Sequence, residues 1–151
     1  MSKRITLENN EPRKIWLGRM IGREIRSAEN SAAAERNTAR VLEGDEKALR
    51  LINVRQLELY GRNLKIALAQ AEAGKDVELV LDNEIQACWV SEMLRDETAR
   101  ARASAAFERL YARGTEKQDM LLHLINAQYL DDYRRVLKTA LRKAKREWTA
   151  A

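Results

Sequence analysis

The sequence AEAGKDVELVLDN, at residues 71–83, decides how this 151-residue chain divides into elements. Gly74 is expected to end a helix, because glycine adopts the left-handed conformation after a helix at no steric cost. Asp76 can begin the next helix, because its carboxylate can accept hydrogen bonds from the free amides of a first turn. Apolar residues also alternate between 77 and 82, which is typical of a short extended segment and would place the start of the helix at 83. We favour a helix from 76.

The same stop-and-start pattern occurs twice more, where Gly44 precedes Asp45 and Gly114 precedes Thr115. Pro12 fits an early position of the first helix, where its missing N–H costs nothing. Connections of one to three residues make consecutive helices pack as antiparallel neighbours. The helices are expected at residues 12–43, 45–73, 76 or 83–113, and 115–148.

The composition favours a helical protein. Hydrophobic residues make up 45% of the chain and charged residues 34%, with one proline and six glycines. This balance is too apolar for a disordered chain and too poor in turn residues for an all-β fold. We predict an all-α, compact bundle of about four long antiparallel helices. It is expected to form one domain at residues 12–151, preceded by a polar N-terminal arm at residues 1–11.

Several function classes are unlikely from residue types alone. Cys88 is the only cysteine and His123 the only histidine, which excludes an internal disulfide and argues against a zinc site. Gly18 and Gly22 lie inside a predicted helix and do not form a phosphate-binding loop. The chain has no run of ~18 apolar residues and no secretory leader. We therefore expect a cytoplasmic protein that is not an enzyme, with no metal, no cofactor and no membrane contact.

The net charge of +5 is unevenly distributed along the chain. Residues 1–26 carry +4 and residues 99–151 carry +6, whereas residues 75–98 carry −5. Basic side chains form three rows at helical spacing, and such rows can bind successive phosphates. The alternative is that they only keep the helices soluble. The rows are Arg134, Lys138, Arg142, Lys145 and Arg146; Arg19, Arg23 and Arg26; and Arg102, Arg109 and Arg113.

A second set of residues is expected to contact other helices or another chain. Amides in the second helix either bond across helices or form an interface; these are Asn53, Gln56 and Asn63. Glu92 and Asp96 lie on an apolar stripe, where carboxylates are costly unless paired. Arg95 and Arg100 could neutralise them, or they could receive an arginine from a partner.

The first turns of the last helix are apolar on nearly every side, at Leu121, Leu122, Leu124 and Ile125. Such a segment is expected to be surrounded, either at the centre of the bundle or by a second copy of the chain. We expect His123, within this run, to be packed in the core or in an interface.

In architecture alone, a basic, all-α chain of this length resembles small assembly subunits of phages and bacterial defence systems. Examples are helical subunits of RNA-guided effector complexes, small terminase subunits, and head or tail adaptors. The absence of an aromatic ladder and of helix-turn-helix spacing argues against sequence readout. We expect a homo-oligomer or complex subunit that contacts DNA or RNA phosphates nonspecifically. The alternative is a protein–protein adaptor, phage structural connector or inhibitor.

Overall fold

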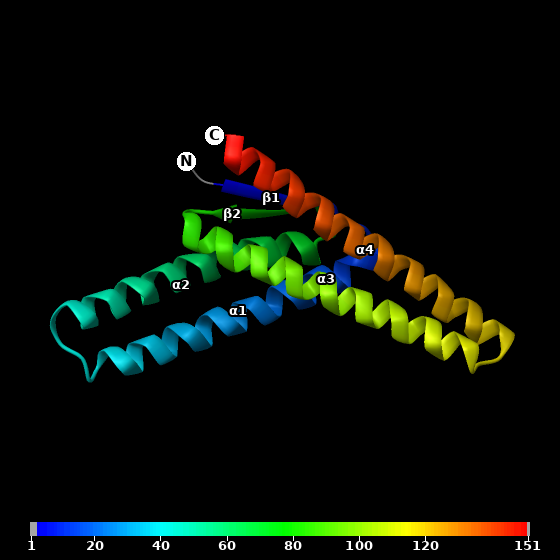
Figure 1. Cartoon of the computed structure of the whole chain (residues 1–151), viewed down its shortest axis with the longest axis horizontal. Helices are drawn as coiled ribbons and strands as arrows, with labels where there is room; N and C mark the ends of the chain where they lie inside the picture. The colour runs from blue at the N-terminus through cyan, green and yellow to red at the C-terminus, as the bar shows by residue number, and fades with distance from the viewer. Residues whose placement is uncertain (1–2, 151) are drawn as a thin grey trace.

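The computed structural model describes residues 3–150, which form four long helices and two short strands (Figure 1). The elements are β1 (Lys3–Leu7), α1 (Glu11–Ala39), α2 (Gly44–Glu72), β2 (Val77–Leu81), α3 (Glu84–Arg113) and α4 (Lys117–Ala150). Helices make up 82% of the structure, as the predicted helical class requires. The helix expected from residue 76 is wrong, because residues 77–81 form the extended segment that was the alternative.

The two strands form an antiparallel ribbon in which Lys3 is opposite Leu81 and Leu7 is opposite Val77. One face is buried, with Ile5 and Leu7 of β1 packed in the core beside the alternate residues of β2. Residues 3–7 therefore do not form the polar arm that we expected. A two-stranded ribbon is marginally stable by itself, and this one rests on α2 and α4.

Side-chain caps start two of the helices. The Asn10 side chain accepts a hydrogen bond from the Arg13 amide at 2.9 Å, and the Asn83 side chain accepts one from the Gln86 amide at 3.0 Å. Each cap satisfies an amide that has no partner within its helix. Asp76, the expected cap of the third helix, instead accepts a hydrogen bond from the Asn9 amide at 3.0 Å.

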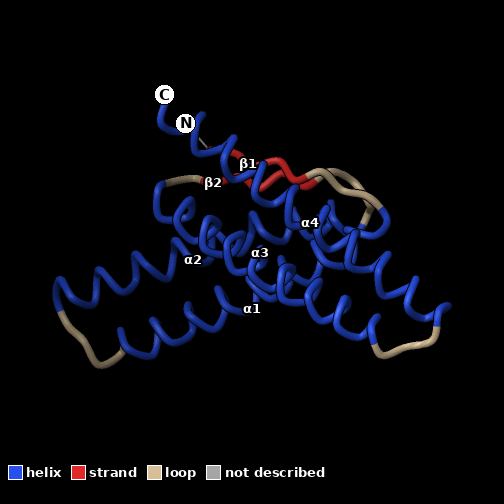
Figure 2. The backbone as a smooth tube through the Cα atoms, turned by 45° about the vertical axis from the view of Figure 1, so that its right-hand side comes forward, coloured by secondary structure: helices blue, strands red, loops and turns tan. Residues whose placement is uncertain are grey.

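The helices pack as two antiparallel hairpins that cross near the middle of the molecule and diverge below the ribbon (Figures 1 and 2). We call α1–α2 the first arm and α3–α4 the second arm. The arms contact each other mainly where α1 crosses α3 and α4, so the four helices do not line one common core along their length. The largest buried side chains lie around the crossing and beneath the ribbon: Leu17, Ile21, Tyr60, Leu64, Leu94, Tyr133 and Leu137.

The order strand–helix–helix occurs twice, and the sequence repeats with it. Residues 10–73 align without a gap with residues 83–146, and 26 of the 64 aligned pairs are identical. Each residue of the first half therefore has an equivalent 73 positions later. Because the two strands pair with each other and the two arms diverge symmetrically, the halves are related by an approximate two-fold axis (Figure 1).

Equivalent contacts recur in both halves. The Trp16 ring lies 5.4 Å from the Tyr133 ring between centroids, and the equivalent Trp89 ring lies 5.2 Å from Tyr60. Each tryptophan thus packs on the tyrosine of the other half, which fastens the two arms together at their crossing. An arginine–carboxylate pair likewise joins the helices of each arm, Arg36 with Glu58 and Arg109 with Asp131.

Candidate functional site

Two pockets lie at the crossing of the arms, at equivalent positions in the two halves. The first, of about 310 Å³, lies between α1 and the second arm and is walled by Trp16, Glu97 and Tyr133. The second, of about 230 Å³, lies between α3 and the first arm and is walled by Trp89, Glu24 and Tyr60. The aromatic and carboxylate walls are therefore the same in both pockets.

The remaining wall residues differ in the sign of their charge. Arg19 and Arg23 line the first pocket, and Glu92 and Asp96 occupy the equivalent positions in the second. Arg100 of the first pocket is replaced by a neutral serine in the second. We call the first the basic pocket and the second the acidic pocket. The two pockets thus share their aromatic and carboxylate walls and differ in the charge of the remaining wall residues.

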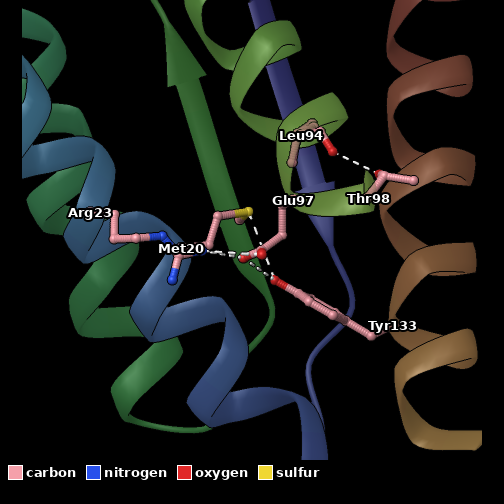
Figure 3. A network of polar contacts seen from close by, with 6 residues as sticks. All are labelled: Met20, Arg23, Leu94, Glu97, Thr98 and Tyr133. Carbon is pink, nitrogen blue, oxygen red and sulfur yellow. Dashed lines mark hydrogen bonds and ion pairs between the residues drawn. The ribbon is translucent and has the colours of Figure 1, made fainter. Parts of the chain in front are cut away.

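The basic pocket is organised around a buried carboxylate, that of Glu97 (Figure 3). Nη2 of Arg23 donates to both Glu97 carboxylate oxygens, at 3.1 and 3.0 Å, and the Tyr133 hydroxyl donates to one of them at 3.0 Å. Burial and the Glu97 charge raise the pKa of Tyr133, which keeps its hydroxyl protonated as a donor. Arg23 therefore has a structural partner. Arg19 and Arg100 form no ion pair within residues 3–150.

An open groove of about 640 Å³ on α1 and α2 adjoins the basic pocket, since Arg19 and Arg23 line both. Lys14 and Arg26 also line the groove, whose one acidic neighbour is Glu72. We call Lys14, Arg19, Arg23 and Arg26 the α1 basic face. At 1.5 Å per helical residue this face extends over roughly 18 Å, enough to follow several phosphates of one strand.

The acidic pocket places three carboxylates near one another. The Tyr60 hydroxyl donates to Glu24 at 3.2 Å, and Glu92 and Asp96 line the same cavity. Burial raises the pKa of Glu24, and the nearby charges of Asp96 and Glu92 raise it further, against the Tyr60 hydrogen bond, which lowers it. In the described chain neither Glu92 nor Asp96 forms an ion pair with an arginine. The predicted neutralisation by Arg95 and Arg100 is therefore absent from residues 3–150.

The other two basic rows lie on separate elements and are partly engaged. Arg109 pairs with Asp131, and Arg134 lies 3.8 Å from the same carboxylate. The exposed remainder of the α4 row is Lys138, Arg142 and Arg146, with Lys145 half-buried; Arg102 and Arg113 are exposed on α3. The predicted row on α1 lines both an open groove and the basic pocket that adjoins it.

The predicted amides hold the junction between β2 and α3. Nδ2 of Asn63 donates to the Val80 carbonyl at 3.0 Å and to Asp82 at 3.1 Å. Gln56 accepts a hydrogen bond from the Asn83 side chain. These bonds agree with the interpretation that the amides fix the packing of neighbouring elements. Asn53 is half-buried nearer the start of α2.

The apolar residues at the start of α4 lie in the part of the second arm that is farthest from the crossing. Leu121, Leu122 and Ile125 are all exposed, so they are not at the centre of a bundle. The alternative, cover by a second copy, stays a prediction. His123 is half-buried, with Nδ1 2.6 Å from a Glu108 carboxylate oxygen, and it does not lie in the core; the alternative, an interface, stays a prediction.

The internal repeat was the signal that sequence reasoning missed, since comparing the chain with itself at a shift of 73 residues aligns the walls of both pockets. None of the described helices is long and apolar enough to cross a membrane. Residues 3–150 contain no group of three or more His, Cys, Asp or Glu side chains suited to a metal ion. No protein-family model, curated protein or solved structure matches this chain.

Proposed function

We propose that this protein is a non-enzymatic assembly subunit whose α1 basic face contacts the phosphate backbone of a nucleic acid without reading its sequence. The observation that carries the proposal is the clustering of Lys14, Arg19 and Arg26, which have no ion-pair partner within residues 3–150, around one open groove. Cations that are not engaged by the protein's own carboxylates are available to replace the counterions of a phosphate chain.

The second half of the chain supports this interpretation as an internal reference. A basic row that served only solubility would be equally useful on either half. Yet the positions equivalent to Lys14, Arg19 and Arg26 are occupied by Ala87, Glu92 and Ala99. The positive charge is therefore specific to one groove on a shared frame.

The outer face of the ribbon supports contact without sequence readout. Ribbons that read bases present polar side chains to a groove of the duplex. Here the outward residues include Arg4, which pairs with Glu78 across the ribbon at 3.5 Å, followed by Thr6 and Val80. This face has no excess positive charge to approach phosphates.

The test is the salt dependence of binding to single-stranded and duplex oligonucleotides of mixed sequence. The variant Arg19→Gln with Arg26→Gln removes two arginines that form no ion pair within residues 3–150. Arg23 is kept, because its loss would leave the buried Glu97 carboxylate without its ion-pair partner. The slope of log affinity against log salt should flatten by ~1.8 on duplex or ~1.4 on single strands. All sequences should be affected alike.

A matched control is Arg102→Gln with Arg113→Gln, which removes the same charge from exposed positions of the second arm. The control should keep most of the wild-type slope. Equal flattening in both variants, or no binding by the wild-type protein at low salt, would refute the proposal.

A second candidate function, a protein–protein adaptor, is favoured by the acidic pocket. Glu92 and Asp96 have no cation of their own among the described residues, so an arginine or lysine of a partner protein could enter beside Tyr60. Binding of a basic peptide that is lost in Glu92→Gln with Asp96→Asn would support this function. Unchanged peptide binding in that variant would exclude the pocket.

A further inference from the structure

Both arms end in exposed apolar side chains at the ends farthest from the ribbon. The first tip patch, around the loop between α1 and α2, is Val41, Leu49, Leu51 and Ile52. The second tip patch, around the loop between α3 and α4, is Phe107, Leu110, Tyr111, Leu121, Leu122, Leu124 and Ile125. Large exposed apolar side chains gathered at one end of an arm in this way are typical of an interface.

Three of the apolar residues at the tips are the same in the two halves. Leu49, Leu51 and Ile52 of the first tip patch are equivalent to Leu122, Leu124 and Ile125 of the second, and all are exposed. Exposed apolar residues elsewhere have not been kept. Ile15 is equivalent to Cys88 and Ile66 to Thr139. These three tip positions are therefore shared by the two halves although they are exposed in the structure of residues 3–150.

The chain exposes more solvent-accessible surface than an average folded monomer of its mass. Folded monomers of 17.4 kDa expose about 7,900 Å² on average, whereas this chain exposes 9760 Å². The excess of about 1,900 Å² exceeds the ~800 Å² that each partner contributes to a standard stable interface. The chain therefore exposes more surface than a second copy would have to cover in an interface of standard size.

The two tip patches are also complementary in bulk. Phe107, Leu110 and Tyr111 project from α3 at the second tip. The equivalent positions of α1 hold the smaller residues Ala34, Asn37 and Thr38. The bulky second tip patch of one copy can therefore pack on the flatter first tip patch of another.

We infer that this chain forms a dimer in which each first tip patch packs on the second tip patch of a second copy. The arms diverge on the side opposite the ribbon, so both tips of one copy can meet the tips of an inverted copy (Figure 1). A two-fold axis between the copies then makes two identical contacts and closes the assembly. This inference does not depend on nucleic-acid binding.

Sedimentation velocity with purified protein tests the dimer. We expect a species of about twice 17.4 kDa at micromolar concentration. The tip variants are Leu49→Gln with Ile52→Gln and Leu122→Gln with Ile125→Gln. Because each variant alters one side of both symmetric contacts, each should weaken dimerisation by ~10²-fold or more. The control is Ile66→Gln, which changes a 60% exposed side chain, against 63% for Leu122.

Chemical crosslinking gives a test that needs no apolar substitution. Lys47 and Lys117 lie beside the loops at the two tips, at opposite ends of the diverging arms. In a mixture of isotopically light and heavy protein, we expect mixed Lys47–Lys117 crosslinks. A wild-type monomer at high concentration would overturn the inference. So would a dimer that keeps its affinity in both tip variants, or one whose crosslinks lie away from the tips.

Discussion

The same substitution at two equivalent positions should have opposite effects on stability. Glu97 and Glu24 are equivalent carboxylates that each accept a hydrogen bond from a buried tyrosine. Glu97 also accepts two hydrogen bonds from Arg23, whereas Glu24 faces Asp96 in place of an arginine. We therefore expect Glu97→Gln to destabilise the protein and Glu24→Gln to leave it unchanged or stabilise it.

The structure sets the size of each effect. Hydrogen bonds between charged groups contribute about 1.5–3 kcal/mol each. A glutamine at position 97 keeps one acceptor oxygen, and the Arg23 side chain is 39% exposed to screening water. We therefore expect Glu97→Gln to lower the free energy of unfolding by about 1–2 kcal/mol. Glu24→Gln removes a charge that burial and two neighbouring carboxylates disfavour, and partial exposure limits the gain to less than about 1 kcal/mol.

Urea unfolding at pH 7, followed by circular dichroism, measures both effects. The midpoint should fall in Glu97→Gln and stay or rise in Glu24→Gln, with the slope m unchanged in each. Equal destabilisation by the two substitutions would contradict this expectation, because it would mean that the different charges around the two carboxylates have no energetic consequence.

Three other predictions concern pH, packing and helix caps. The raised pKa of Glu24 means that the folded state holds this proton more tightly than the unfolded state does. The stability that the protonated Glu24 contributes is therefore present below pH 4.5 and is lost as pH rises through the folded pKa. In urea unfolding at a series of pH values, the Glu24→Gln variant should not show this loss of stability. Leu137→Ala should cost ~2–5 kcal/mol in the same assay, because the side chain is fully buried at the crossing. Asn10→Ala and Asn83→Ala should each cost ~1 kcal/mol, and a cost near zero at both would contradict the capping geometry.

The helices could be predicted from the sequence because their limits depend on local chemistry. Gly44 and Gly74 adopt left-handed φ angles of 64° and 74°, so the breaks that they mark are where the chain turns. β2 could not be assigned with the same certainty, because five alternating residues fit a strand only if a partner strand exists. That partner, β1, lies more than seventy residues earlier in the chain, and its own alternation of Ile5 and Leu7 with polar residues is equally short.

The sequence predicts several residues of the candidate site but not how the fold brings them together. Arg19, Arg23 and Arg26 were predicted as a row, but their separation into one ion-paired arginine and two free ones depends on Glu97, which lies on another helix. Glu92 and Asp96 appeared as misplaced charges on an apolar stripe. In the structure Glu92 and Asp96 are exposed on α3, and Glu97 is the buried carboxylate. Only the repeat shows that these carboxylates occupy the positions of Arg19 and Arg23.

If nucleic-acid phosphates bind the α1 basic face, adding a short single-stranded oligonucleotide should change the chemical shifts of the backbone amides on that face. We expect chemical-shift perturbations at residues 14–26 of α1 and around Arg100. Away from Arg100, the equivalent residues 87–99 of α3 should show none. Perturbations confined to residues 138–146 of α4, or no perturbation at low salt, would contradict binding at the α1 basic face.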